Sequence, residues 1–90
     1  MPTVKNVIVS KPLPEQESTC KSWPIWRCEP STFEWTYTET ETCRLLEGAA
    51  VVTDGKDSVS FKAGDWVVFP KGLTCTWNIQ ETVVKYYNFS

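Results

Sequence analysis

Short stretches of alternating apolar and polar residues, separated by turn residues, run along most of the chain. The clearest lies at 73–79, where Cys75, Trp77 and Ile79 share one face while threonines and Asn78 share the other. Such alternation is typical of a strand with one buried face. No long stretch carries the apolar repeat of an amphipathic helix. The pattern therefore predicts an all-β protein.

Turn residues divide the rest of the chain into short strands. The Asp54-Gly55 pair is the strongest hairpin signal. Gly48 is expected to break the longest strand, and Pro24 places its strand at an edge or a bulge. Strands this short and closely spaced predict a small barrel or double sheet. The expected strands are 4–9, 23–29, 33–37, 41–53, 58–62, 66–69, 73–79 and 83–89, with an irregular polar connection at 11–21.

The length of the chain limits it to one domain. Its 90 residues supply one modest hydrophobic core and no second one. No linker, repeat or low-complexity segment divides the sequence. We therefore expect a single domain over 1–90, in which 1–22 is an N-terminal strand and irregular arm and 23–90 is the barrel.

Charge and hydropathy exclude several classes of partner. The net charge is −2 and the lysines and arginines are spread evenly, so nucleic acid is not an expected partner. No apolar run approaches the ~20 residues that span a bilayer, so no membrane partner is expected either. The N-terminal residues lack the pattern of a secretory signal, which makes a cytoplasmic location with reduced thiols the expectation.

Histidine is absent, and its absence removes many reactions. Without imidazole there is no Ser-His-Asp or Cys-His catalytic arrangement and no His-ligated zinc, iron or manganese. The four cysteines, Cys20, Cys28, Cys43 and Cys75, form no C-x-x-C pair, which excludes zinc-ribbon and thioredoxin-like motifs. Some of these thiols are expected to be small buried hydrophobes.

Two segments of the chain form a recognisable pair of motifs. In the first, Glu41 is followed by Gly48. In the second, Gly64 is followed by Pro70 and then by Gly72, and these residues suit tight corners between strands. Together the two segments resemble the signature motifs of the cupin superfamily.

The sequence around these motifs narrows the resemblance. The runs at 26–30, 33–37 and 69–77 are similar to those of the small single-domain, RmlC-like cupins grouped with ureidoglycine aminohydrolase. The similar stretch extends from Trp26 to Phe89. The resemblance implies an all-β, single-domain cupin-like jelly-roll β-barrel, also called a double-stranded β-helix, with a pocket inside one end.

The same resemblance shows where this chain departs from a metal-binding cupin. The two histidines of the first motif fall on Trp35 and Tyr37, its glutamate on Glu41, and the histidine of the second motif on Cys75. Indole offers only a donor, and neutral phenol is a poor ligand. We therefore expect no metal and no other cofactor. A zinc site made by Glu41, Cys43 and Cys75 is the alternative that the spacing leaves open.

Strand alternation directs a set of side chains into the expected pocket. Aromatic rings there would either stack on a ring-containing ligand or simply fill a small barrel, and the sequence leaves both alternatives open. The candidate pocket residues are Trp35, Tyr37, Glu41, Cys43, Cys75 and Trp77.

Glu41 is the first candidate catalytic residue. An inward-facing carboxylate is costly unless a donor satisfies it. The Tyr37 hydroxyl, the Trp35 indole, Arg27 and Arg44 are the candidate partners. If burial dominates instead, its pKa would rise and Glu41 would serve as a general acid or base.

Cys75 is the second candidate, as a nucleophile. A reactive thiolate needs a nearby base or positive charge, and an adjacent carboxylate would raise the thiol pKa.

Three hypotheses for function remain open. The first is a metal-free cupin domain that binds a small polar or ring-containing ligand. The second is an enzyme acting on a ureide or another small nitrogenous metabolite, with Glu41 and a residual metal. The third is a structural protein with a filled barrel that forms a homodimer through its N-terminal strand. A small-molecule ligand and a second copy of the chain are thus the expected partners.

Overall fold

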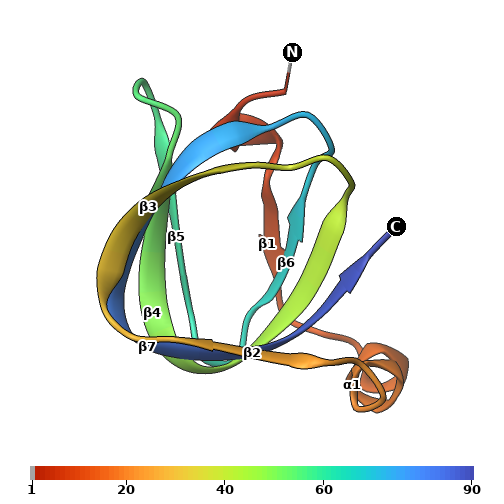
Figure 1. Cartoon of the computed structure of the whole chain (residues 1–90). Helices are drawn as coiled ribbons and strands as arrows, with labels where there is room; N and C mark the ends of the chain where they lie inside the picture. Colours follow the sequence, from red (N-terminus) through yellow and green to blue (C-terminus); the bar gives the residue numbers. More distant parts are fainter. Residues whose placement is uncertain (1) are drawn as a thin grey trace.

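Seven antiparallel strands wind into a small barrel around one core (Figure 1). The computed structural model describes residues 2–90. The elements are η1 (Val4–Asn6), β1 (Ile8–Ser10), α1 (Pro14–Cys20), β2 (Ile25–Cys28), β3 (Ser31–Thr36), β4 (Glu41–Thr53), β5 (Ser58–Lys62), β6 (Trp66–Phe69) and β7 (Thr74–Phe89). The sheet order is β1-β6-β4-β7-β2, while β3 also pairs with β7 and β5 with β4. This architecture confirms the all-β jelly roll expected from the sequence.

The long strand β7 holds the barrel together. It has 16 residues and pairs with β2, β3 and β4. The two separate strands expected at 73–79 and 83–89 are therefore wrong, because no glycine or proline interrupts the residues between them. Its neighbour β4 is also one continuous strand. The break expected at Gly48 is instead a bulge in the β4–β7 pairing.

The N-terminal residues differ most from the expectation. The strand expected over 4–9 is wrong for its first half. There the Thr3 hydroxyl accepts a hydrogen bond from the amide of Lys5 and caps a turn of 3-10 helix at 4–6. Only the second half pairs with a neighbour, as β1 against β6. Val4 and Val7 are both buried in the core, so this segment belongs to the body of the barrel.

The connection expected to be irregular at 11–21 contains α1, so that expectation is wrong. Pro14 opens the helix, and Glu15 and Glu17 lie in its first turn, where acidic side chains are favourable. Glu17 also accepts a hydrogen bond of 2.6 Å from Arg44 of β4, which fixes the helix to the barrel wall. Among residues 2–90, no helix has the length and apolar character of a membrane span.

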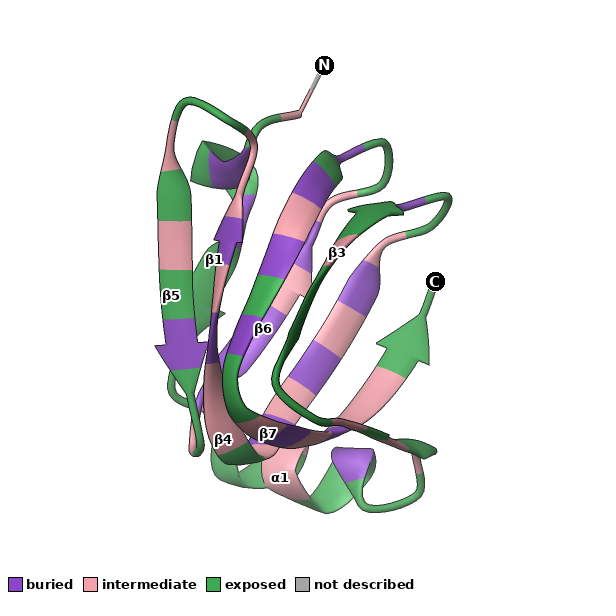
Figure 2. Cartoon of the chain, turned by 60° about the vertical axis from the view of Figure 1, so that its left-hand side comes forward, coloured by how far each residue is buried: buried purple, intermediate pink, exposed green. Residues whose placement is uncertain are grey.

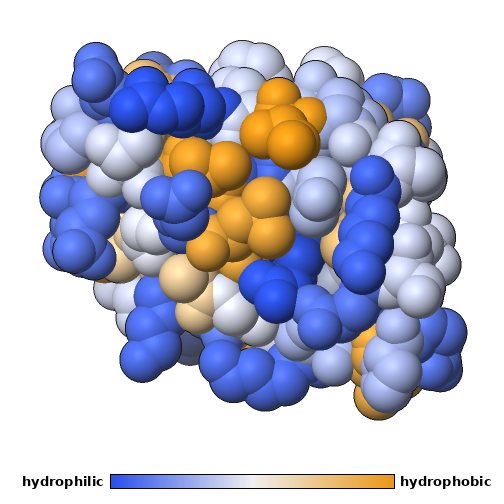
Figure 3. Space-filling model, turned by 90° about the horizontal axis from the view of Figure 1, so that it is seen from below, coloured by the Kyte–Doolittle hydropathy of each residue, from blue (hydrophilic) through white to orange (hydrophobic). Residues whose placement is uncertain are grey.

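Exposed apolar side chains lie on β1 and β2, the two strands at the ends of the sheet order. Strand β2 begins only after Pro24, which has no amide to donate, so it is shorter than the expected 23–29. Ile8 on β1 is 59% exposed and Ile25 on β2 is 58% exposed. Seen from below, the outer wall shows apolar side chains gathered among polar ones (Figure 3). A homodimer through the β1 edge stays a prediction.

Burial alternates along the central strands, as the sequence pattern predicted. Bands of buried and less buried residues follow one another along β4 and β7 (Figure 2). The inward rings pack on one another, with Phe61 and Phe69 each 5.3 Å from Trp77 between ring centroids. The core fills one end of the barrel, and the other end remains hollow.

Candidate functional site

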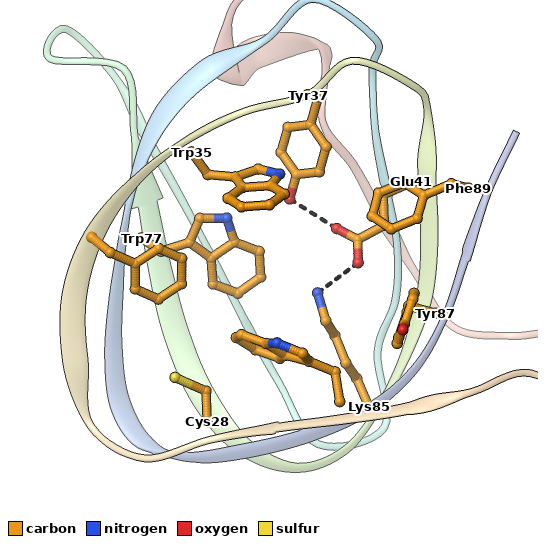
Figure 4. A pocket seen from close by; sticks show the side chains of 10 residues that line it. Cys28, Trp35, Tyr37, Glu41, Trp77, Lys85, Tyr87 and Phe89 are labelled. Carbon is orange, nitrogen blue, oxygen red and sulfur yellow. Dashed lines mark hydrogen bonds and ion pairs between the residues drawn. The ribbon is translucent and has the colours of Figure 1, made fainter.

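A cavity of about 450 Å³ lies inside the open end of the barrel (Figure 4). Most of its wall is aromatic, and β2, β3 and β7 supply the rings. The stacked pair Phe33 and Trp77 has nearly parallel planes with centroids 6.1 Å apart, and Trp26 meets Trp77 edge-on. Tyr87 and Phe89 complete the wall on the C-terminal part of β7. The cavity is therefore a hydrophobic chamber with few polar groups.

Trp35 lines the cavity, but its side chain is also exposed to solvent. It is 49% exposed although it shares a strand face with Phe33. Strand β3 has β7 as its only paired neighbour among residues 2–90, so one side of the indole meets solvent. Trp35 lies edge-on to Tyr37, with ring centroids 6.4 Å apart. This ring thus forms part of the entrance to the cavity.

Glu41 places a carboxylate in this apolar chamber. Glu41 is the first residue of β4, and the residue as a whole is only 3% exposed. The Tyr37 hydroxyl donates a hydrogen bond of 2.8 Å to its Oε1 atom, which confirms one of the expected partners. Burial and the neighbouring Glu41 raise the pKa of Tyr37 above its ordinary value, so this phenol stays protonated and acts as a donor.

Lys85 supplies the second donor, and the sequence reasoning missed it. Its Nζ lies 2.7 Å from Oε2 of Glu41, and both side chains are buried. The same ammonium lies 4.8 Å from the ring centroid of Trp26 and 4.6 Å from that of Trp77, within cation–π distance. One ion pair and two cation–π contacts therefore hold the Lys85 ammonium inside the barrel.

Both arginines considered as partners of Glu41 are ruled out by the structure. Arg44 pairs with Glu17 instead, and Arg27 is exposed on β2. A signal for Lys85 was present in the alternation, because Val83 is buried and Lys85 follows it by one strand period. Lysine is so often solvent-exposed that this position does not stand out in the sequence.

The predicted site residues divide into two groups. Trp35, Tyr37, Glu41 and Trp77 surround the cavity, but Cys43 and Cys75 do not line it. Both thiols are buried in the hydrophobic core instead. Alternation gives the face of a strand that a side chain occupies, but it does not give the depth along the barrel at which the cavity ends.

The buried thiols are also unreactive in character. Burial, and to a smaller extent the charge of Glu41, raises the pKa of Cys75 to about 11. Burial likewise raises the pKa of Cys43 to about 12. The Cys75 thiol donates a weak hydrogen bond of 3.7 Å to the carbonyl of Trp35. A protonated, buried thiol of this kind disfavours the nucleophile role considered for Cys75.

The donor set at the motif positions does not fit a divalent metal. Indole cannot ligate, and Tyr37 is protonated and donates to Glu41. The Lys85 ammonium already occupies the place beside Glu41 that a cation would take. Within residues 2–90, no three Cys, Asp or Glu side chains converge on a common point, so the zinc site considered at Glu41, Cys43 and Cys75 is wrong.

Comparison with known families agrees with this geometry. The profile of the EutQ-like cupin domain matches residues 15–87. The chain belongs to this EutQ-like cupin family. The resemblance to the cupin superfamily is thereby confirmed. No curated protein matches this cupin domain.

Solved structures with the same fold include one of high similarity. A DUF861 family protein from Thermotoga maritima is 43% identical, with a TM-score of 0.89, and the match covers 94% of this cupin domain and 100% of that chain. The EutQ protein of Clostridium difficile is 18% identical with a TM-score of 0.68, and the match covers 96% of this domain and 71% of that chain. At that identity the EutQ comparison shows the fold alone.

Proposed function

We propose that this EutQ-like cupin domain binds a small polar or ring-containing molecule in the open end of its barrel, without a metal ion. The observation that carries the proposal is the cavity of about 450 Å³ with aromatic walls and a buried polar group at Glu41 and Lys85. Ligand sites in proteins are typically concave chambers of this size, mostly apolar and furnished with a few placed polar groups.

The aromatic wall supports a ring-containing ligand. Core rings elsewhere in the barrel pack against one another, whereas Trp35 keeps an exposed face at the entrance. An exposed indole at a cavity mouth is a ready surface for stacking on a planar ring. The filled-barrel hypothesis fits the core end of the molecule but not this end, where the space remains open.

The metal-free part of the proposal is supported by charge. A divalent cation at the motif positions would lie against the Lys85 ammonium, which is 2.7 Å from the only carboxylate of the cavity lining. A cation bound to that carboxylate would lie close to the ammonium, and like charges repel strongly in a buried site. A binding function needs no metal, because the walls and the polar pair supply the contacts.

The alternative is an enzyme of the ureide-metabolising type, which the sequence resemblance to the ureidoglycine aminohydrolase branch suggests. Glu41 would then be its acid or base. Both oxygens of Glu41 already accept hydrogen bonds from protein donors, which supports a fixed acceptor rather than a proton carrier. Metal analysis of protein purified without chelator would favour this alternative if it found a full equivalent of a transition metal.

The experiment that tests the binding function is a thermal-shift screen of small planar molecules, followed by titration of the compounds that stabilise the protein. Replacing Trp35 with alanine is expected to weaken a hit about tenfold, because stacking on one ring contributes roughly that much. The fold should survive, since half of the side chain is already in solvent. Trp23→Ala is the matched control, because Trp23 packs against Trp66 outside the cavity.

Two results would count against the proposal. One is a screen in which no compound shifts the melting temperature. The other is a hit whose affinity falls equally in the Trp35 and Trp23 variants, since that pattern would place the binding site elsewhere or trace the loss to stability.

A further inference from the structure

We infer that the pocket selects an uncharged planar group that carries a hydrogen-bond donor beside an acceptor, as a carboxamide or a lactam does. This inference rests on the proposed function, because it names the ligand class of the same pocket. It follows from the charges, the aromatic rings and the free hydrogen-bonding positions around Glu41 and Lys85.

The charges of the cavity cancel each other. Glu41 and Lys85 are its only charged lining residues, and they form a closed pair with Nζ and Oε2 2.7 Å apart. Their side chains are 4% and 5% exposed, so water screens the pair poorly. A ligand with a net charge would leave one unbalanced charge in a poorly solvated chamber, which is costly.

The place for a ligand cation is already taken. The Lys85 ammonium lies 4.6 Å from the ring centroid of Trp77, 4.8 Å from that of Trp26 and 5.9 Å from that of Phe69. Aromatic rings with a carboxylate beside them are the arrangement that recognises ligand ammonium groups. Here the protein's own side chain fills that cage, so a cationic ligand has no partner to gain.

A ligand anion meets the opposite difficulty. It would have to draw Lys85 away from Glu41, and the carboxylate would then remain buried without its countercharge. Tyr37 would be the remaining donor to Glu41 among residues 2–90. Removing one partner of a buried ion pair is strongly unfavourable.

The pair still has hydrogen-bonding capacity for a neutral group. Lysine has three N–H donors, and within residues 2–90 Glu41 provides the one oxygen that accepts from Lys85. Each oxygen of Glu41 accepts one bond here and has a second lone pair. A donor and an acceptor therefore lie side by side, which matches the carbonyl and N–H of one amide edge, while the attached ring packs on the aromatic wall.

Three probes of the same shape distinguish the effect of ligand charge on affinity from the effect of ligand shape. Benzamide, benzoate and benzamidinium each carry a planar group on one benzene ring, and they are neutral, anionic and cationic at neutral pH. Isothermal titration of the unmodified protein is expected to give benzamide an affinity at least about tenfold above that of either ion. This comparison needs no substitution and so does not depend on the stability of a variant.

Substitution of each charge should reverse the preference in a defined direction. Lys85→Met removes the ammonium and leaves Glu41 without a countercharge, so benzamidinium should become the tightest of the three probes. Glu41→Gln leaves Lys85 without its carboxylate, so benzoate should gain. The double variant Glu41→Gln with Lys85→Met has no charge in the cavity and should keep the preference for benzamide, and circular dichroism would verify that each variant is folded.

Each outcome of the probe series is decisive. Equal affinities for the three probes, or tighter binding of either ion to the unmodified protein, would overturn the inference and leave the binding function intact. Failure of all three probes would overturn the inference, and if the screen also found no other small ligand, the proposed function would be overturned as well.

Discussion

Two charged residues that lie 44 positions apart in the sequence meet inside the barrel and set its chemistry. Glu41 and Lys85 are buried together, and Tyr37 completes the group by donating to the carboxylate. Neither charge would be tolerated alone in such a place, because the loss of hydration is only offset when both partners are present. Burial of Glu41 therefore requires Lys85 beside it, and burial of Lys85 requires Glu41.

The pair makes a prediction about stability. Lys85→Met should lower the free energy of unfolding by about 3–5 kcal/mol, because it leaves Glu41 buried without a countercharge. Adding Glu41→Gln to that variant should recover much of the loss, since no buried charge then remains. Urea denaturation of the two single variants and the double variant gives the coupling energy.

An exposed pair of similar chemistry provides the control. Lys5 and Asp57 lie 3.8 Å apart at the surface, and Lys5→Met should change stability by less than about 1 kcal/mol. Additive effects of the Lys85 and Glu41 substitutions would contradict the coupling described here.

A second prediction at this scale concerns pH. The Asp54 carboxylate accepts hydrogen bonds from the backbone amides of Asp57, Val4 and Lys56. These hydrogen bonds lower its pKa from 3.8 to about 2. Because the folded pKa is the lower one, Asp54 stabilises the fold above about pH 4, and this contribution is lost as the pH falls toward 2.

Denaturation at a series of acidic pH values tests this contribution. Asp54→Asn should be less stable than the unmodified protein near neutral pH, and the difference should shrink as the pH falls. Glu34→Gln serves as the control, because Glu34 is exposed and forms no ion pair within residues 2–90. A constant difference across the whole range would contradict the assignment.

At the scale of elements, the approach of β4 to β7 controls the shape of the barrel. The pairing shifts register around Gly48, which has a φ of 91°. A Cβ atom at Gly48 would lie 2.1 Å from the carbonyl oxygen of Thr82, so only glycine fits there. The bulge lets the two long strands bend together while both remain continuous.

Two alanine substitutions separate crowding from backbone strain. Gly55 has a similar φ of 96° but open space around it, so Gly55→Ala should cost about 1–2 kcal/mol. Gly48→Ala should cost clearly more, because the strain is the same and the backbone of β7 must also move. Thermal unfolding of both variants gives the comparison, and equal losses would show that the contact with Thr82 is unimportant.

The elements also show which structural features local sequence can predict. The Asp54-Gly55 turn and the strands beside it were predictable, because the turn residues and the alternation agree. Helix α1 was missed because its seven residues are too few to show an apolar repeat, although proline and two glutamates at its start are a helix signal. The continuity of β7 was also visible locally, because residues 80–82 contain neither glycine nor proline to end a strand.

At the scale of the whole molecule, the site resisted prediction more than the fold did. The fold follows from alternation and turns, which are local. The cavity depends on how far the core fills the barrel, and that is decided by rings such as Phe61 and Phe69 from different strands. Alternation therefore identified inward residues correctly but placed Cys43 and Cys75 at the wrong depth.

The four cysteines report on the integrity of the whole molecule. Cys28 is partly exposed, whereas Cys43 and Cys75 are buried and have pKa values raised to about 12 and about 11. In the native state, iodoacetamide should modify Cys28 quickly, but it should reach Cys43 and Cys75 only when the barrel unfolds.

Mass spectrometry of the alkylated peptides over time measures these rates. Cys20 lies in the short helix α1 and is expected to react at an intermediate rate, because α1 can fray without opening the barrel. Modification of Cys75 as fast as that of Cys28 would contradict the closed core described here.

The pairing of β7 with three strands has a consequence for synthesis on the ribosome. Strands β2, β3 and β4 leave the ribosome before the partner they share, so the edges that face β7 stay unpaired until it has emerged. Such long-range pairings form slowly, and exposed edges invite contact with other nascent chains. Lys85 also arrives with β7, so Glu41 remains in water until the same moment. Chaperone protection during translation should therefore matter more for this small barrel than its size alone suggests.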